Sequence, residues 1–193
     1  MNASKPIQTS RPVSVNSADP SAAGKLRDAL LACMEGRAAN RELVLLCIGT
    51  DRATGDSLGP LTGHKLSARA RSAAHITVYG TLESPIHAKN LEASMTRIQS
   101  AHNNPFIVAI DACLGKSSRV GWLTVSCGPV RPGAALQKAL PDVGDVAVMG
   151  VVNLSGMMEL LVLQNTRLHT VMCMADIIAD GIGAALGLPG GHA

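Results

Sequence analysis

Two short, unbroken runs of apolar residues constrain the fold of this chain more than any other feature of its sequence. They are Leu43–Ile48 (LVLLCI) and Phe106–Ile110 (FIVAI). A strand that is apolar at every position is typical of a parallel sheet covered on both faces. Helical patterns over Pro60–Arg71 and Ile86–Ser100 lie between the two runs, and a strand-like segment over His75–Thr81 lies between the helices. This alternation predicts an α/β fold, a single-domain three-layer sandwich around a twisted, mostly parallel sheet with right-handed crossovers.

Further elements are expected on either side of this core. Helical patterns cover Lys25–Glu35 before the first strand, and Gly156–Gln164 and His169–Leu186 at the end of the chain. Trp122–Ser126 and Asp145–Val151 have the pattern of two more strands. No helix clearly separates the first of these from the strand before it, so we expect a different pairing sense there.

The length of the chain favours one domain. At 193 residues it can close one hydrophobic core and is short for two. Residues 1–24 are rich in Ser, Pro, Asn and Ala without an apolar period, which predicts a disordered or loosely attached arm. The α/β domain is expected to cover residues 25–188, followed by a C-terminal tail over residues 189–193.

Charge and aromatic content exclude nucleic-acid binding. The chain has 17 Lys and Arg against 14 Asp and Glu, a net charge of +3, which is low for a protein that binds nucleic acid electrostatically. Its aromatic residues are Tyr79, Phe106 and Trp122, too few for a base-stacking surface. We therefore expect no nucleic-acid partner.

The last apolar run, Val171–Leu188, approaches the length of a membrane span, but Asp176 and Asp180 interrupt it on one helical face. This pattern is typical of an amphipathic or core-lining helix, so we expect no membrane partner. The run also offers apolar surface for a homo-oligomer. No secretory signal is visible. The five cysteines are odd in number and lie mostly in apolar runs, which favours buried free thiols in a reducing, cytoplasmic compartment.

Two aspartates stand where a parallel sheet binds its ligands. Asp56 lies in the glycine-bearing loop 49–60 after the first apolar run, and Asp111 directly follows the second run. Ligands of open α/β sheets bind beyond the carboxyl ends of the strands, so neighbouring parallel strands would place both carboxyl groups in one cleft. Such a pair can share a proton and serve as base and acid. Helix capping by Asp56 and a local hydrogen bond of Asp111 at the strand end are the structural alternatives.

Other chemistries fit the sequence less well. The loop lacks the glycine spacing of a phosphate-binding loop, and Asp56 stands where the lysine of that motif would be. Cys113 is more typical of a buried thiol than of a nucleophile. The zinc motifs C-x-x-C and H-x-x-x-H are absent. His87 follows the second strand, so His87, Asp56 and Asp111 form a candidate set for a divalent metal ion, with a backbone-bonded histidine at a helix start as the alternative.

Several long motifs carry a family resemblance. The stretch CIGTDRATGDSLGPLTGHKL, followed by VYGTLESPIHAKNL, FIVAIDACLG and VGDVAVMGVVNLSG, resembles the sporulation protein YyaC family, whose members are regarded as spore proteases. The resemblance covers about Leu43–Leu186 and leaves out the N-terminal arm. The family is similar to germination protease, an atypical aspartic endopeptidase of spores, and more distantly to the hydrogenase maturation endopeptidases.

This resemblance implies a phosphorylase/hydrolase-like α/β fold and catalytic roles for Asp56 and Asp111, which match the aspartate pair proposed for germination protease. The hydrogenase peptidases have an acidic metal ligand at the position of Asp56 and an aspartate near Asp111. Their histidine ligand comes later in the chain, whereas His87 precedes Asp111.

We therefore expect an atypical aspartic endopeptidase that hydrolyses peptide bonds in a spore or sporulation protein. Asp56 and Asp111 would activate water, and backbone N–H groups of the loop with Gly55, Ser57 and Gly59 would polarise the scissile carbonyl. Such an enzyme needs no cofactor and takes a protein or peptide as its partner, in the cytoplasm of a sporulating cell or the spore interior. Two alternatives stay open: a non-catalytic sporulation factor that binds ligands in the same cleft, and a maturation peptidase that uses a divalent metal.

Overall fold

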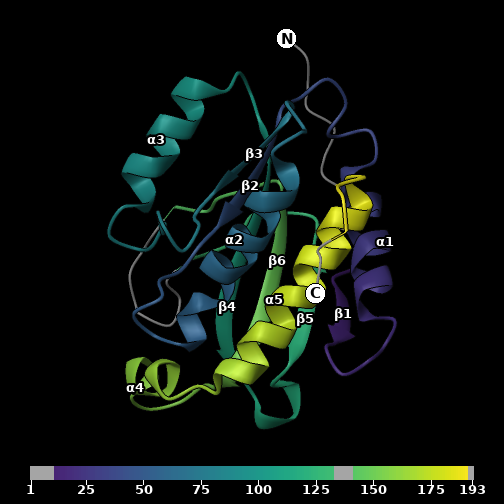
Figure 1. The fold of residues 1–193 in the computed structure, drawn as a ribbon. Helices are drawn as coiled ribbons and strands as arrows, with labels where there is room; N and C mark the ends of the chain where they lie inside the picture. The colour runs from purple at the N-terminus through teal and green to yellow at the C-terminus, as the bar shows by residue number, and fades with distance from the viewer. Residues whose placement is uncertain (1–10, 133–140, 191–193) are drawn as a thin grey trace.

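The computed structural model describes residues 11–132 and 141–190. The described strands are β1 (Val13–Asn16), β2 (Leu43–Cys47), β3 (Ile76–Tyr79), β4 (Phe106–Gly115), β5 (Trp122–Ser126) and β6 (Val146–Leu154). They form one sheet in the order β1-β5-β6-β4-β2-β3 (Figure 1). β6, β4, β2 and β3 are parallel to one another, and β5 is antiparallel to both of its neighbours. The predicted mostly parallel sheet is confirmed, and so is the different pairing sense of Trp122–Ser126.

Helices cover both faces of the sheet and complete the three layers (Figure 1). The helices α1 (Ala22–Met34), α2 (Leu58–Ala70) and α5 (Leu168–Ala185) pack on one face, and α3 (Leu91–Ala101) packs on the other. The connections contain the short helix α4 (Glu159–Gln164) and two 3-10 turns, η1 (Gly55–Ser57) and η2 (Ser117–Arg119). The predicted α/β sandwich is thus the observed architecture.

The strand β2 shows why an unbroken apolar run marks the centre of such a sheet. All five of its residues are buried. Leu43, Leu45 and Cys47 belong to the core cluster under α1, α2 and α5, while Val44 and Leu46 belong to the cluster under α3. Because alternate side chains of a strand point to opposite faces, a strand covered on both sides needs apolar residues at every position.

The helix α5 has the length and hydropathy of a membrane span, the only such helix found in residues 11–132 and 141–190. In this structure Val171, Met174, Ile178 and Ile182 form its buried stripe, which packs against α1, α2 and the sheet. The helix therefore serves as a core helix within the fold. The apolar surface that we expected it to offer to a second subunit is largely used inside the chain.

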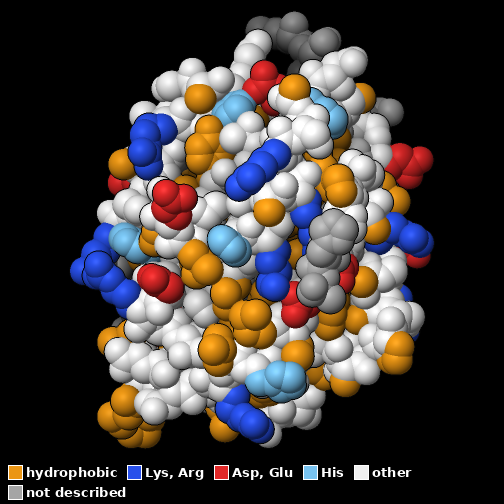
Figure 2. Space-filling view, viewed as in Figure 1, with side chains coloured by type: hydrophobic (Ala, Val, Ile, Leu, Met, Phe, Trp, Pro, Cys, Tyr) orange, Lys and Arg blue, Asp and Glu red, His pale blue; other side chains and the backbone are white. Residues whose placement is uncertain are grey.

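Exposed apolar side chains gather instead around α4, at the lower left of Figure 2. Met157 is 89% exposed and Met158 is 69% exposed, and Leu160 and Leu161 of α4 are also exposed.

The expected boundary of the N-terminal arm at residue 24 is wrong. Val13–Asn16 pairs with β5 at the edge of the sheet, and Val15 is 3% exposed. The helix α1 begins at Ala22, three residues earlier than expected. A four-residue edge strand with a single buried side chain leaves almost no hydrophobic pattern, which is why the sequence did not reveal it. Residues 1–10 of the arm and 191–193 of the tail lie outside the described residues.

The expectation of free thiols is wrong for two of the five cysteines. Cys33, on the buried face of α1, forms a disulfide with Cys127, which directly follows β5. The two residues are 94 positions apart in the sequence and meet because α1 packs beside β5. Cys47, Cys113 and Cys173 are free.

Two element boundaries near the candidate site also differ from the predicted ones. The strand β4 continues past Ile110 to Gly115, so Asp111 lies inside the strand rather than after it. The helix α3 begins at Leu91 rather than at Ile86, because Ile86 forms a parallel bridge with Ile48 and thereby extends the sheet. The segment between Ile86 and α3 is thus a loop beside the end of β2.

Candidate active site

The sheet topology places Asp111 and Asp56 at the same edge. The neighbouring strands β2 and β4 are parallel, and their ladder continues past β2 through a hydrogen bond from Ile48 N–H to Ile110 O of 2.7 Å. Asp111 is the next residue of β4. The loop after β2 turns back on itself, because Thr50 N–H donates to the backbone oxygen of Asp56 over 3.1 Å. Asp56 is therefore held in η1, just beyond the end of β2.

Two glycines, Gly49 and Gly59, let the loop after β2 pack closely against the end of that strand. A Cβ atom on Gly59 would lie 2.0 Å from the carbonyl oxygen of Ile48, and one on Gly49 would lie 2.0 Å from that of Asp56. Gly49 also has a φ of +139°, which side-chain-bearing residues rarely adopt. A larger residue at either position would push α2 and Asp56 away from the end of β2.

Gly55 fits against the segment around α4, where a Cβ atom would lie 2.8 Å from the side chains of Leu163 and Thr166. Both hydrogen-bond donors of Ser57 are used inside the loop, since its N–H and its Oγ donate to Thr54 O over 3.2 and 2.6 Å. Gly55, Ser57 and Gly59 are absent from the wall of the cavity described next. In the described structure these three loop residues support the loop that holds Asp56.

A cavity of about 220 Å³ contains both aspartates. Its wall combines three titratable groups, two cationic side chains and several small or apolar residues. The lining residues are Ile48, Gly49, Thr50, Arg52, Asp56, His87, Ala88, Lys89, Asp111 and Pro132. The predicted common cleft of Asp56 and Asp111 is therefore present, and His87 lies in the same cleft.

Burial raises the pKa of both aspartates. Asp111 is 6% exposed, and its desolvation raises its pKa well above the ordinary value. The charge of Asp56 raises the pKa of Asp111 further, whereas a 2.8 Å hydrogen bond from Ala112 N–H to Oδ1 acts to lower it. Burial also raises the pKa of Asp56, whereas the Thr50 N–H and His87 act to lower it. The two carboxyl groups thus interact, and both hold protons more tightly than exposed aspartates do.

His87 is tied to its own loop by two hydrogen bonds. The backbone N–H of His87 donates to Asn90 Oδ1 over 2.7 Å. Its ring Nδ1 accepts from the backbone N–H of Lys89 over 3.3 Å. A neutral ring in this arrangement carries its proton on Nε2. The backbone-bonded histidine that we considered as an alternative is thus observed, together with a place in the cavity.

The candidate metal set is not arranged as a set of ligands. Asp56, Asp111 and His87 line one cavity, yet among residues 11–132 and 141–190 no group of three or more His, Cys, Asp or Glu side chains could hold a metal ion. The geometry therefore gives no support to the assignment of His87 as a metal ligand.

Cys113, two residues after Asp111, is a poor nucleophile. Burial raises the pKa of its thiol to about 11, with a further contribution from the charge of Asp111. Because the thiolate is the reactive form of cysteine, the predicted structural role of this residue fits its surroundings.

Arg52, Lys89 and Pro132 are wall residues that were not predicted as part of the site. Arg52 follows Asp51 in the loop after β2, and the part of the chain that the structure describes contains no ion pair between them. Lys89 lies two residues after His87, which is the one sequence signal that could have pointed to it. Pro132 comes from a separate segment after β5, and no sequence signal indicated it.

Comparisons with known proteins agree with this fold. The chain matches the solved structure of the [NiFe] hydrogenase maturation protease HycI from Thermococcus kodakarensis KOD1 with a TM-score of 0.54, at 15% sequence identity. The match covers 82% of this chain and 98% of the other. At this identity the likeness concerns the fold alone.

Two sequence comparisons identify the family. The chain is 49% identical over 161 residues to the uncharacterized protein YyaC of Bacillus subtilis (strain 168), a match that covers 83% of this chain and 78% of YyaC. Residues 14–181 match the family described as "Protein of unknown function (DUF1256)". This range begins within β1, in agreement with the place of that strand in the sheet. The chain therefore belongs to the DUF1256 family and is a relative of YyaC, as the resemblance of its motifs implied.

Proposed function

We propose that this protein is an endopeptidase in which Asp56 and Asp111 act as a base and an acid on a bound peptide bond. One observation carries the proposal: two carboxyl groups with raised pKa values share a single cavity at the ends of adjacent parallel strands. Pairs of carboxyl groups that share a proton are suited to acid–base hydrolysis. The HycI-like fold and the resemblance to germination protease support a peptidase over other hydrolases.

The surroundings of the two groups suggest different roles. Asp111 is almost fully buried and lies beside the charge of Asp56, so it keeps its proton to higher pH. Asp56 is partly exposed and lies near His87, and a positive charge on that ring would favour the ionised carboxylate. In the proposed reaction, Asp56 takes a proton from water as the water attacks the peptide carbonyl. Protonated Asp111 donates a hydrogen bond to the carbonyl oxygen.

The departing amine then needs a proton. Asp56, which has gained one from water, gives it to the amine nitrogen as the carbon–nitrogen bond breaks, so the pair returns to its starting state with one shared proton. This assignment replaces the loop N–H groups expected from the sequence, because Gly55, Ser57 and Gly59 lie outside the cavity wall.

The proposed substrate is a protein or peptide of a sporulating cell or spore, as the family resemblance implies, and the proposed compartment is the cytoplasm of such a cell. Arg52 and Lys89 line the cavity together with the apolar Ile48, Ala88 and Pro132. This mixed wall suits a peptide that presents an apolar side chain to the cavity and an acidic one to Arg52 or Lys89.

The test is mass spectrometry of new protein termini after incubation of the protein with an extract of sporulating cells. We expect new termini with the wild type and with Asp51→Asn, a control in the same loop whose side chain is exposed and outside the cavity wall. Asp56→Asn and Asp111→Asn should produce none, and a chelator should have no effect.

Cleavage that persists in Asp56→Asn would contradict the proposed mechanism. Cleavage that a chelator abolishes would favour the metal-dependent alternative. A peptide that binds equally well to the wild type and to Asp56→Asn and is never cleaved would favour the non-catalytic binding factor.

A further inference from the structure

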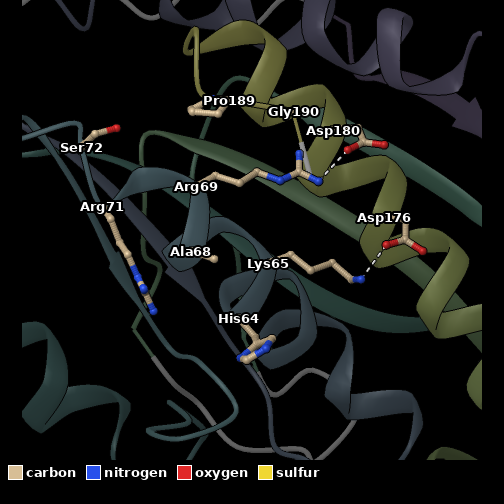
Figure 3. Close-up of a pocket in the computed structure, with 10 residues that line it drawn as sticks. All are labelled: His64, Lys65, Ala68, Arg69, Arg71, Ser72, Asp176, Asp180, Pro189 and Gly190. Atoms are coloured by element: carbon tan, nitrogen blue, oxygen red, sulfur yellow. Dashed lines mark hydrogen bonds and ion pairs between the residues drawn. The ribbon is translucent and has the colours of Figure 1, made fainter. Parts of the chain in front are cut away.

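A second and larger cavity lies between α2 and α5, away from the aspartate pair. Its volume is about 850 Å³, within the range of small-molecule sites. None of its lining residues belongs to the wall of the candidate active site. Figure 3 shows side chains from α2, from α5 and from the segment after α5 around this space.

One face of α2 supplies most of the wall. The residues recur at helical spacing, so they form two adjacent stripes along the end of the helix and the turn after it. Ala68 stands in the middle of this face, and its small side chain leaves room between the longer ones (Figure 3). The lining residues from this segment are His64, Lys65, Ala68, Arg69, Arg71 and Ser72.

The helix α5 contributes two aspartates that face the same space. Lys65 Nζ lies 2.6 Å from an Asp176 oxygen, and Arg69 Nη2 lies 2.7 Å from Asp180 Oδ1. Arg69 also donates from Nη1 to Ala179 O over 3.0 Å, and its side chain is only 12% exposed. Both cations are therefore held in fixed positions at the cavity wall, which reduces the entropy lost when a ligand binds to them.

Arg71 and His64 complete the wall without such partners. Neither side chain forms an ion pair or a hydrogen bond with any residue in the described ranges. Figure 3 shows both on the side of the cavity opposite the aspartates. The two aspartates are thus neutralised by Lys65 and Arg69, and the charge of Arg71 is left over. On the surface over α2 and α5, cationic and acidic side chains lie interspersed (Figure 2).

We propose that this cavity binds a small phosphorylated anion, with Arg71 as its principal charged contact. A guanidinium group can donate two parallel hydrogen bonds to phosphate oxygens, and Arg71 has no competing partner. Lys65 has two further N–H donors beyond the one directed at Asp176, and His64 and Ser72 add further donors at the wall. This site does not depend on the proposed peptidase activity.

Isothermal titration with inorganic pyrophosphate, at constant ionic strength, tests the site. Arg71→Gln should weaken binding by on the order of tenfold, the loss expected for one charge-assisted contact. Arg27→Gln is the matched control, because Arg27 is an exposed arginine of α1 outside the cavity. It removes the same charge and should leave the affinity unchanged.

A second pair of variants tests whether the release of Arg69 from its acidic partner strengthens pyrophosphate binding. Asp180→Asn frees Arg69 for the ligand, so it should tighten pyrophosphate binding several-fold, whereas Asp28→Asn, on α1, should not.

A titration with adenosine diphosphate shows what the phosphate is attached to. Tighter binding than that of pyrophosphate indicates a nucleotide, and equal binding indicates recognition of the phosphates alone. No binding of pyrophosphate to the wild type at millimolar concentration would overturn the proposal. Equal losses in Arg71→Gln and Arg27→Gln would overturn it too.

Discussion

Replacement of Gly59 by alanine tests how the fold positions Asp56. The added Cβ atom would lie 2.0 Å from the carbonyl oxygen of Ile48, far inside the 3.4 Å at which ordinary contact begins. The obstacle is backbone, and Ile48 is fixed by its 2.7 Å hydrogen bond to Ile110 O and by its bridge to Ile86. The start of α2 must therefore move away from β2, and the preceding turn with Asp56 must move with it.

The expected cost follows from two contributions. Overpacking of a rigid site costs about 1–3 kcal/mol. Alanine returns up to about 1 kcal/mol of helix propensity. The net loss is about 1–2 kcal/mol, which for a chain of this length lowers Tm by roughly 2–8 °C. In the proposed mechanism, a displacement of the Asp56 carboxyl group by about 1 Å lowers the cleavage rate by on the order of 100-fold.

Thermal unfolding measures the first effect, with Gly24→Ala as its control. Gly24 lies in α1, and a Cβ atom there meets nothing within 4 Å. Gly24→Ala should therefore raise the stability by about 0.5–1 kcal/mol, the ordinary gain of alanine over glycine in a helix. A Gly59→Ala protein as stable as Gly24→Ala, with unchanged cleavage, would refute the described packing of α2 on the end of β2.

Two more predictions concern the core. Reduction of the Cys33–Cys127 disulfide, or Cys33→Ala, should lower the free energy of unfolding by about 2–4 kcal/mol, because the bond closes a loop of 94 residues. A urea midpoint that is unchanged by dithiothreitol would contradict this prediction. Asp111→Asn should gain stability relative to the wild type as the pH rises from 4 to 8. The raised pKa of the buried carboxyl makes the folded wild type bind the proton more tightly than the unfolded chain does, so its stability falls as the pH rises toward that pKa, while asparagine does not titrate. A Tm difference between the two proteins that is the same at both pH values would count against the raised pKa.

The central strands could be predicted because burial on both faces leaves a strong sequence pattern. Leu43–Cys47 and the first half of Phe106–Gly115 consist of apolar residues, and both strands start at the predicted residue. The edge strand Val13–Asn16 was missed because one buried valine carries little information. The start of α3 was misplaced because Ile86 follows the helical period but pairs with Ile48, a long-range contact that local pattern does not contain.

The candidate site could be predicted only in part, for a related reason. The common location of Asp56 and Asp111 follows from a general rule of parallel sheets, which needs only the order of strands and loops. The positions of Arg52 and Pro132 depend on the paths of individual loops. The meeting of Cys33 and Cys127 likewise depends on how α1 packs beside β5, and spacing along the chain gives no hint of it.

The central claim is that Asp56 and Asp111 form one interacting pair, and an NMR titration of the aspartate carboxyl carbons tests it most directly. We predict that Asp111 titrates above the range of ordinary aspartates and that its pKa falls in Asp56→Asn, because the negative charge of Asp56 is removed. Asp51→Asn, with its exposed side chain in the same loop, should leave the titration of Asp111 unchanged. An ordinary pKa for Asp111, or a raised one that is the same in Asp56→Asn and the wild type, would contradict the account.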